Sequence, residues 1–407
     1  MDPHAVNSAP VLGFLNNVYE GLVRRGKDMA IEPALATAWE PIGEGEGWRF
    51  TLRQGVTFHD GSAFTAEDVL FSYQRASDEA SDTRSWFAPV SDVKVVDDFT
   101  VDILTSAPNP IFPDSIANWM MVDRGWATAN DAALPNKDDG NYATLNANGT
   151  GAFKVTAREP GLRTVLEPHD GWWGEVEHNV TRAEFTPIQN PATAVAALLS
   201  GDVDLINPLV SPAMRGFSTA NNMRPAYDVE GARALMAEAG YADGFSFGLK
   251  CPNDRYLNDE AVCQAVVGML AQIGITAELD AMPVRTYWPE LREDNFDMYL
   301  LGWSPGTFDA EHPIRFLAST PNIEKKLGSW NFGGYSNARI DTLLPMIQSE
   351  IDDAKRQAML DESAKILQDE VAYVPLYVQP LVWGTRDNIA LTQRPDNFFI
   401  LRWVSVN

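Results

Sequence analysis

Residues 48–73 constrain the fold more than any other stretch of this 407-residue chain, with the sequence WRFTLRQGVTFHDGSAFTAEDVLFSY. Apolar and polar side chains alternate over 48–53 with the two-residue period of a half-buried strand. Thr65 then stands three residues before Asp68, a spacing typical of a capped helix start. The stretch therefore predicts strand, turn and amphipathic helix in the order expected of a mixed α/β domain.

The same alternation of strands and helices continues along the chain. Residues 93–103 predict a hairpin with its turn at Asp97 and Asp98. Asp228 is a good helix cap, and Leu235 falls on the apolar face of the helix that it would start. We expect helices at 16–24, from Asn190 onward, and at 228–239, 259–273, 338–349 and 353–370, and strands at 152–156, 245–250, 275–279, 297–303 and 398–404.

The charge balance excludes several classes of partner. Lys and Arg number 31 against 56 Asp and Glu, which leaves a net charge of −25. Nucleic acids and anionic lipids both need clustered cations, so we expect neither as a partner. No apolar run approaches the roughly 20 residues of a membrane span. No secretory signal is visible at the start either.

The cysteines and histidines do not predict a metal site. Cys251 and Cys263 are twelve positions apart, and they are either two buried free thiols or a disulfide. Export would favour the disulfide, because oxidising compartments preserve such bonds. Neither cysteine has a zinc-type spacing, and the five histidines form no HExxH-like cluster. No nucleotide-binding fingerprint is present, so we expect no cofactor.

The segment from residue 36 to residue 69 resembles the signature of the family 5 solute-binding proteins, the dipeptide, oligopeptide and nickel receptors of ABC importers. The matching residues are Ala36–Trp39, Leu52–Val56, Phe58–Gly61 and Thr65–Val69. The C-terminal third adds segments in the family's order: 335–337, 355–356, 375–379, 394–397 and 401–403. The resemblance thus covers nearly the whole chain.

This resemblance implies an α/β fold of the periplasmic binding protein type II class, with two lobes, discontinuous domains and a hinge. Residues 1–37, 150–212 and 380–407 would form the main domain of lobe 1, residues 38–149 its accessory domain, and residues 213–379 lobe 2. Compared with the family, we expect the first strand and its signal peptide to be missing before Asp2, and an internal segment to be missing near residue 212.

The strongest candidate for a ligand site is the loop that follows the expected strand 297–303. Ligands of open α/β sheets lie beyond the carboxyl ends of strands. Trp303, next to Ser304, could stack on a ligand there. Asp309 could pair with a cation. The resemblance implies that Asp309 matches the aspartate that binds the ligand's α-ammonium in peptide receptors. The alternative is that Asp309 caps a turn and Trp303 fills the core.

The second candidate is the loop after the strand that ends at Lys250. Arg255 offers a planar fork of donors suited to a carboxylate, and Tyr256 is next to it. The resemblance implies an arginine in roughly this region that holds the ligand carboxylate. A surface ion pair of Arg255 with Asp254 or Asp259 is the alternative. Asp309 and Arg255 together would suit the two ends of a zwitterion.

The function implied by the resemblance is capture of a short peptide or similar small zwitterion by lobe closure, without catalysis. The expected partner is an inner-membrane ABC permease, and the expected state a monomer in the periplasm. Twelve tryptophans leave open a carbohydrate receptor or a glycoside hydrolase, although Trp172 and Trp173 are better explained by packing. A scaffold or chemoreceptor partner that has lost its cleft is a third alternative.

Overall fold

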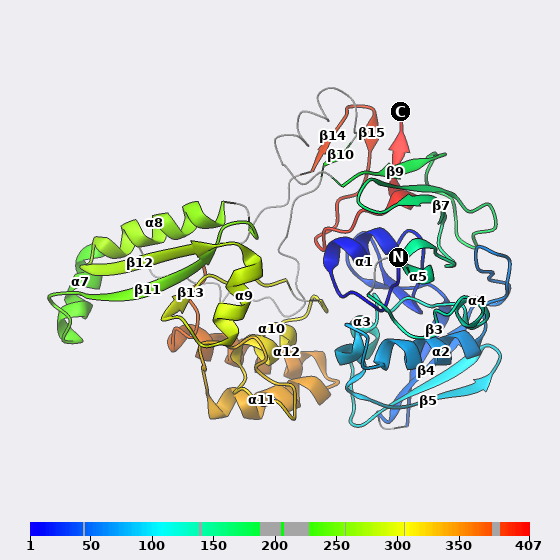
Figure 1. Ribbon diagram of the computed structural model, residues 1–407. Coiled ribbons are helices and arrows are strands. Elements are labelled where there is room, and N and C mark those ends of the chain that lie inside the picture. The colour runs from blue at the N-terminus through cyan, green and yellow to red at the C-terminus, as the bar shows by residue number, and fades with distance from the viewer. Residues whose placement is uncertain are drawn as a thin grey trace. The chain divides into compact units, whose positions relative to one another are not determined.

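The computed structural model describes residues 1–43, 45–137, 141–187, 205–206, 228–256, 258–304, 306–376 and 383–407. The chain divides into two compact units (Figure 1). Unit 1 consists of Met1–Ala213, Gln348–Ile351 and Val378–Asn407, and unit 2 of Met214–Ile347 and Asp352–Tyr377. Unit 1 therefore combines stretches that are far apart in the sequence, whereas only residues 348–351 separate the two stretches of unit 2.

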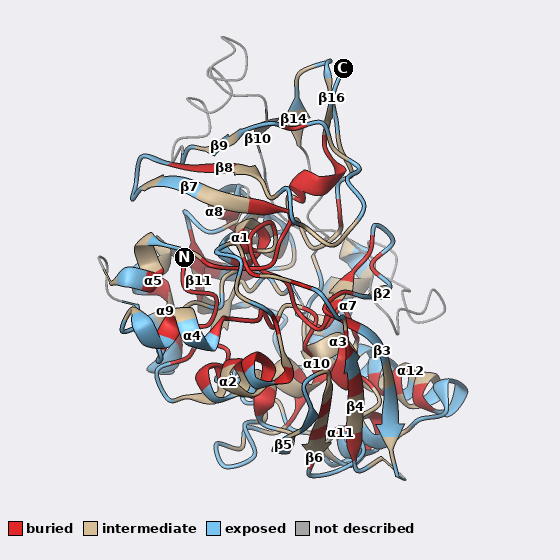
Figure 2. Cartoon of the chain, turned by 90° about the vertical axis from the view of Figure 1, so that its right-hand side faces the viewer, coloured by how far each residue is buried: buried red, intermediate tan, exposed pale blue. Residues whose placement is uncertain are grey.

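A four-stranded antiparallel sheet with the order β3-β4-β6-β5 forms one layer of unit 1. Its strands are β3 (Ala36–Ile42), β4 (Gly47–Leu52), β5 (Val90–Asp97) and β6 (Thr100–Thr105), and α2 (Ala66–Ser77) follows β4 in the chain. Phe50 and Leu52 of β4 are buried whereas Thr51 is exposed, which confirms the predicted alternation (Figure 2). The hairpin of β5 and β6 is also confirmed, since Asp97 pairs with Thr100 at its turn.

Helix α2 begins where the sequence predicts. The Asp68 carboxylate accepts the backbone N–H of Thr65 at 2.9 Å, so a side chain satisfies an N–H group at the start of the helix. Val69 and Ala76 of α2 share a hydrophobic core with Phe50 of β4. Local capping and sheet packing therefore favour the same boundary.

The remaining elements of unit 1 are short. A second antiparallel sheet has the order β7-β8-β9, and three two-stranded ladders join β1 to β2, β10 to β14 and β15 to β16. The strands are β1 (Val23–Arg25), β2 (Ile31–Pro33), β7 (Phe153–Glu159), β8 (Arg163–Pro168), β9 (Ala183–Phe185), β10 (Leu205–Ile206), β14 (Gly384–Thr385), β15 (Ile389–Ala390) and β16 (Ser405–Val406). The helices are α1 (Ala9–Leu15), α3 (Phe112–Ser115), α4 (Arg124–Ala129) and α5 (Tyr142–Leu145), and 3₁₀ turns cover Arg84–Phe87 and Leu401–Trp403.

The first helix ends before the predicted one begins. The prediction of a helix at 16–24 is wrong, because α1 covers Ala9–Leu15 and β1 starts at Val23. The Asn16 side-chain amide donates to the Leu12 carbonyl at 2.9 Å, and that of Asn17 donates to the Phe399 carbonyl at 2.9 Å. Such local side-chain bonds compete with helix continuation.

The C-terminal end of the chain belongs to the core of α1. Leu15, Phe398 and Leu401 are buried in one hydrophobic cluster. The predicted strand at 398–404 is wrong, since residues 401–403 form a 3₁₀ turn and β16 starts at Ser405. The Leu401 N–H donates to the Asn17 side-chain oxygen at 2.7 Å, so this backbone group bonds a side chain and not a strand.

Unit 2 is built on a parallel sheet with the order β12-β11-β13. Its strands are β11 (Phe245–Pro252), β12 (Ile275–Met282) and β13 (Met298–Tyr299). Its helices are α7 (Val229–Glu238), α8 (Asp259–Ala271), α9 (Val284–Arg292), α10 (Glu311–Pro313), α11 (Ala338–Ser349) and α12 (Asp353–Asp369), and a π-helical turn covers Ile314–Ala318. Helix α8 connects β11 to β12 and α9 connects β12 to β13, as parallel pairing requires.

Two expectations for unit 2 differ from the structure, although most of its elements are confirmed. Strand β13 is only two residues long, whereas residues 297–303 were expected to form a strand. Helix α7 has its predicted cap, since the Asp228 carboxylate accepts the Gly231 N–H at 2.8 Å. However, no residue of α7 is buried, and Leu235 is 66% exposed. Periodicity predicts an apolar stripe but does not say what covers it.

The helix expected from Asn190 lies outside the described residues. Within the described ranges, no helix is both long enough and apolar enough to cross a bilayer.

A buried ion pair holds the N-terminal residues against α2. Arg75 donates from Nη1 to Asp2 Oδ1 at 2.7 Å, and the same nitrogen is 3.2 Å from His4 Nδ1. His4 Nε2 lies 2.9 Å from the Met120 carbonyl oxygen, to which it donates. Because a guanidinium can only donate, His4 Nδ1 accepts and the imidazole is neutral. Burial, together with the Arg75 charge, lowers the pKa of His4 to about 3.

We therefore expect His4 to make the stability of unit 1 depend on pH. A histidine in the unfolded chain has a pKa of about 6.5. The pKa of His4 is lower in the folded protein than in the unfolded chain. Neutral His4 therefore contributes its full stability above the unfolded pKa of about 6.5, and this stability is lost as the pH falls toward 3. Between pH 7.5 and 5.5 the wild type should lose about 1 kcal/mol more unfolding free energy than His4→Gln. Urea unfolding of both proteins at each pH measures this difference, and equal losses would contradict a neutral His4.

Candidate functional site

The two loops predicted to bind ligand lie at the same edge of the unit 2 sheet. β11 and β13 run parallel, with Leu249 opposite Met298, so their carboxyl ends point the same way. The loop with Arg255 and Tyr256 follows β11, and the loop that starts at Gly302 follows β13. The Gly302 N–H donates to the Tyr256 hydroxyl oxygen at 2.9 Å. Tyr256 thus joins the two loops directly.

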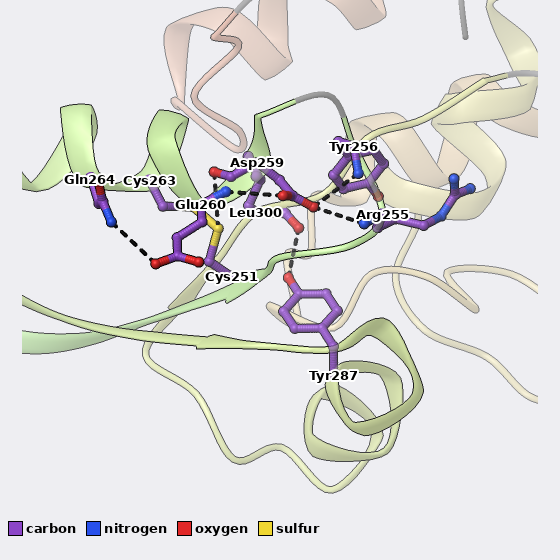
Figure 3. Close-up of a disulfide and its surroundings, with 9 residues drawn as sticks. All are labelled: Cys251, Arg255, Tyr256, Asp259, Glu260, Cys263, Gln264, Tyr287 and Leu300. Carbon is purple, nitrogen blue, oxygen red and sulfur yellow. Dashed lines mark hydrogen bonds between the residues drawn. A yellow bond between two sulfur atoms is a disulfide. The ribbon is translucent and has the colours of Figure 1, made fainter. Parts of the chain in front are cut away.

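Arg255 is exposed, and its guanidinium pairs with no acidic side chain in the described part of the chain. The Asp259 carboxylate accepts the backbone N–H groups of Arg255 and Tyr256, both at 2.9 Å. The Asp254 carboxylate accepts the Val284 N–H at 2.6 Å. The ion pair considered as the alternative for Arg255 is therefore not formed. Figure 3 shows the guanidinium directed away from Asp259 and the disulfide.

Backbone and side-chain bonds also fix the position of this loop. Cys251, at the end of β11, forms a disulfide with Cys263 of α8 (Figure 3). Between them in sequence, Asp259 is the first residue of α8 and accepts the two loop N–H groups. The Tyr287 hydroxyl of α9 donates to the Leu300 carbonyl at 2.6 Å, which holds the chain after β13. The loop geometry is thus set before any ligand binds.

Trp303 belongs to an aromatic cluster in the loop after β13. Its ring centroid is 5.8 Å from those of Phe316 and Trp330, and its indole N–H donates to His312 Nδ1 at 3.3 Å. The Trp303 side chain is half-buried. It thus packs against this cluster and is also partly exposed to solvent. Ser304 next to it is exposed. Burial lowers the pKa of His312 to about 3, which agrees with a neutral ring that accepts from Trp303.

Asp309 is buried and bonded to Arg356 of α12. Its two carboxylate oxygens accept from Arg356 Nη1 and Nη2, each at 2.8 Å. Oδ1 also accepts the Glu311 N–H at 2.8 Å, which is the turn cap considered as the alternative. Arg356 Nε donates to the Ile347 carbonyl of α11 at 3.0 Å. The pair therefore connects the loop to both C-terminal helices of unit 2. Binding of a ligand ammonium by Asp309 stays a prediction.

Sequence reasoning did not single out a group of charged side chains in unit 1. The buried Glu20 carboxylate accepts the indole N–H groups of Trp172 at 3.2 Å and Trp173 at 2.7 Å. The Trp pair thus packs against and bonds Glu20, as a packing role implies. Burial raises the pKa of Glu20. Arg24 is four positions after Glu20, and this spacing, which places both on one side of a short segment, was the available sequence signal.

No group of three or more His, Cys, Asp and Glu side chains in the described ranges is placed to hold a metal ion.

The sequence model of the bacterial extracellular solute-binding proteins, family 5 (Middle), matches residues 30–214 and 205–325, well over half of the chain. The chain belongs to this family. The family expected from residues 36–69 is therefore confirmed, and with it a solute-binding receptor of the ABC importer class.

Curated relatives and solved structures agree with this assignment. The glutathione-binding protein GsiB of Salmonella paratyphi A is 24% identical over 463 residues, covering 96% of this chain and 88% of the relative. The periplasmic binding protein DppA of Helicobacter pylori, in complex with the peptide STSA, is 20% identical with a TM-score of 0.78, covering 100% of this chain and 95% of that one. AgaA of A. tumefacien R10, in complex with agropinic acid, is 20% identical with a TM-score of 0.77, and the match covers 98% of this chain and 95% of AgaA. These likenesses confirm the predicted fold class.

The comparisons also bear on the length of the chain. The alignment with GsiB is longer than the chain itself, so the relative has residues for which this chain has no counterpart. The two segments matched by the family model overlap at residues 205–214. Sequence analysis expects the missing internal segment near residue 212, within this overlap.

We expect Asp309→Ala to destabilise unit 2 by about 3–5 kcal/mol, because it leaves the buried Arg356 without its carboxylate. The exposed pair of Arg339 and Glu362 in the same unit supplies the control, and Glu362→Ala should cost less than about 1 kcal/mol. Urea unfolding followed by tryptophan fluorescence measures both. A loss for Asp309→Ala as small as for Glu362→Ala would contradict a structural role of the ion pair.

The disulfide should stabilise unit 2 through the short loop that it closes. Cys251 and Cys263 are separated by 12 positions. Replacing both by alanine should lower the unfolding free energy by up to about 3 kcal/mol, the chain-entropy value for such a loop. The Arg255 amide should also exchange with solvent faster, since one of the bonds that fix its loop is lost. Unchanged exchange in the double variant would show that Asp259 alone fixes the loop.

Proposed function

We propose that this protein is a periplasmic receptor, monomeric when free, that binds a short peptide or similar small zwitterion and delivers it to an inner-membrane ABC permease. It would perform no catalysis. The observation that carries the proposal is the Arg255 guanidinium, which is exposed, held in place by its backbone and unpaired with any acid in the described residues. Such a planar donor fork suits a carboxylate.

The neighbours of Arg255 support binding of a small organic ligand. The Tyr256 ring centroid lies 5.2 Å from the guanidinium carbon. Through its bond with Gly302, Tyr256 also brings the loop of Trp303 and Ser304 next to Arg255. Aromatic side chains with a few polar groups are typical of small-molecule sites. GsiB is named for glutathione and DppA was solved with a peptide, and both kinds of ligand carry a terminal carboxylate.

The ammonium end of the ligand is assigned to Asp309. An ionised carboxylate has about four acceptor positions, and three hydrogen bonds use Asp309 in the structure. One acceptor position thus remains for an ammonium without loss of Arg356. In this arrangement Arg356 would hold the Asp309 carboxylate oriented for its second partner.

Arg255→Gln should weaken binding of peptides with a free carboxylate by about 10-fold to 100-fold, the worth of a charge-assisted hydrogen bond. A peptide with an amidated C-terminus should bind both forms alike. Arg233→Gln, on the exposed helix α7, is the matched control and should bind like the wild type. Isothermal titration calorimetry measures the affinity of the wild type and both variants for the peptide and for its C-terminal amide.

A thermal-shift screen selects the peptide for this experiment. Dipeptides, glutathione, opines, oligosaccharides and nickel should be compared, since a ligand at 100 times its dissociation constant stabilises by about 2.7 kcal/mol. If only oligosaccharides raise the melting temperature, the ligand is a sugar and not a peptide. Hydrolysis of a glycoside would contradict the absence of catalysis. No shift with any compound would favour a scaffold or chemoreceptor partner.

A further inference from the structure

Unit 1 holds an arginine cluster that consists of Arg24, Arg53 and Arg402. In the described part of the chain, buried N–H groups of Arg24 and Arg402 lack acceptors, whereas Arg53 Nε donates to the Ala34 carbonyl at 3.1 Å. Arg402 is only 8% exposed, and in the described part of the chain its guanidinium forms neither a hydrogen bond nor an ion pair. Its guanidinium carbon lies 4.6 Å from the centroid of the Trp403 ring. Arg24 has two buried nitrogens, Nε and Nη1, without a hydrogen bond.

The three arginines come from separate segments but belong to one site. Trp173 lies between two of them, with its ring centroid 3.9 Å from the Arg53 guanidinium carbon and 5.5 Å from that of Arg24. Arg402 and Arg24 are close enough to repel each other, and both act on the charge of Glu20. Segments from the two ends of the chain therefore meet at this cluster.

The acids near the cluster do not satisfy these donors. The Glu20 carboxylate already accepts from Trp172, Trp173 and the Thr150 hydroxyl, the last at 3.1 Å. Glu32 reaches Arg24 only at 3.5 Å between Oε2 and Nε, and its side chain is 43% exposed. Three cations therefore face two carboxylates, and one of these carboxylates already accepts three hydrogen bonds from other donors.

An arginine that is buried without acceptors destabilises a fold, since neither water nor a carboxylate compensates its lost hydration. Like charges beside it, here Arg24, add to this cost. The arrangement is therefore unfavourable as a purely structural device. It becomes favourable once an anion with several acceptor oxygens occupies it, since planar guanidinium groups bind carboxylate and phosphate oxygens in pairs.

We propose that the arginine cluster is a binding site for an oxyanion, and that this group is an acidic carboxylate of the transported solute. This inference rests on the proposed receptor function and narrows its ligand class to acidic peptides and similar acidic zwitterions. Arg402 and Arg24 bind the oxyanion, while Arg53 and Trp173 form the half-buried side of the site. Glu20 keeps the indole groups in place.

The test compares two tripeptides that differ in one group, Ala-Glu-Ala and Ala-Gln-Ala, by calorimetry on the full chain. The wild type should bind the acidic peptide about tenfold tighter or more. Arg402→Gln should remove the preference for the acidic peptide and leave the affinity for Ala-Gln-Ala unchanged. Arg24→Gln should reduce this preference. The control is Arg49→Gln in the same unit, which should keep the preference. Arg49 of β4 pairs with Asp102 of the neighbouring strand β6.

Stability supplies a second measurement, independent of ligand. If Arg402 were a structural residue, Arg402→Gln would lower the melting temperature of the free protein. The proposed site predicts an equal or higher melting temperature, because the variant removes a buried charge without acceptors. A clear decrease together with an unchanged peptide preference would overturn the proposal.

Inorganic phosphate distinguishes the source of the oxyanion. Phosphate that stabilises the wild type but not Arg402→Gln, with no preference between the peptides, would keep the oxyanion site and assign it to a free anion. Equal binding of both peptides and no effect of phosphate would overturn the site while the receptor function stands. If the wild type binds no peptide at all, the receptor proposal fails, and the phosphate comparison alone decides on the site.

Discussion

The parallel pairing of β11 with β12 and β13 is the constraint on which the candidate site of unit 2 depends. Parallel strands deliver their following loops to one edge, so two segments almost fifty residues apart in sequence meet there. A hydroxyl from one loop then bonds the backbone of the other, and a disulfide fixes the first loop to the next helix. The strands and helices determine where the two loops lie, and the loops carry the side chains that we propose to bind a solute.

The arginines of this protein differ in how completely they are bonded, and the proposed binding roles rest on this difference. Arg356 and Arg75 are buried and bonded to carboxylates through both ends of the guanidinium. Arg255 and Arg402 have no such partner in the described residues, one in solvent and one buried. In a chain with a net charge of −25, carboxylates are abundant, so an arginine left without one is informative.

Local sequence predicted the elements that local chemistry decides. The Thr65–Asp68 cap, the Asp97 turn and the Asp228 cap each depend on residues a few positions apart, and each is present. The helix at 16–24 and the strand at 398–404 were wrong because Asn17 bonds to backbone groups near residue 400. The pairing of Asp309 with Arg356 and the cluster around Trp173 likewise depend on contacts between distant residues. The positions of two expected strand ends pointed to the loops of Arg255 and Trp303 as candidates, but not to the partners of their side chains.

The bonds between Asn17 and residues 399 and 401 affect the order in which the protein can assemble. Unit 1 needs both ends of the chain for its second core, so a ribosome must finish the whole polypeptide before that core can close. Unit 2 lies between these ends and can complete its own contacts earlier. Contacts of such long sequence separation form slowly, because the loop entropy is lost before the contact is gained. Until the last residues are made, α1 therefore lacks Phe398 and Leu401 as packing partners, and this core stays incomplete for almost the full time of synthesis.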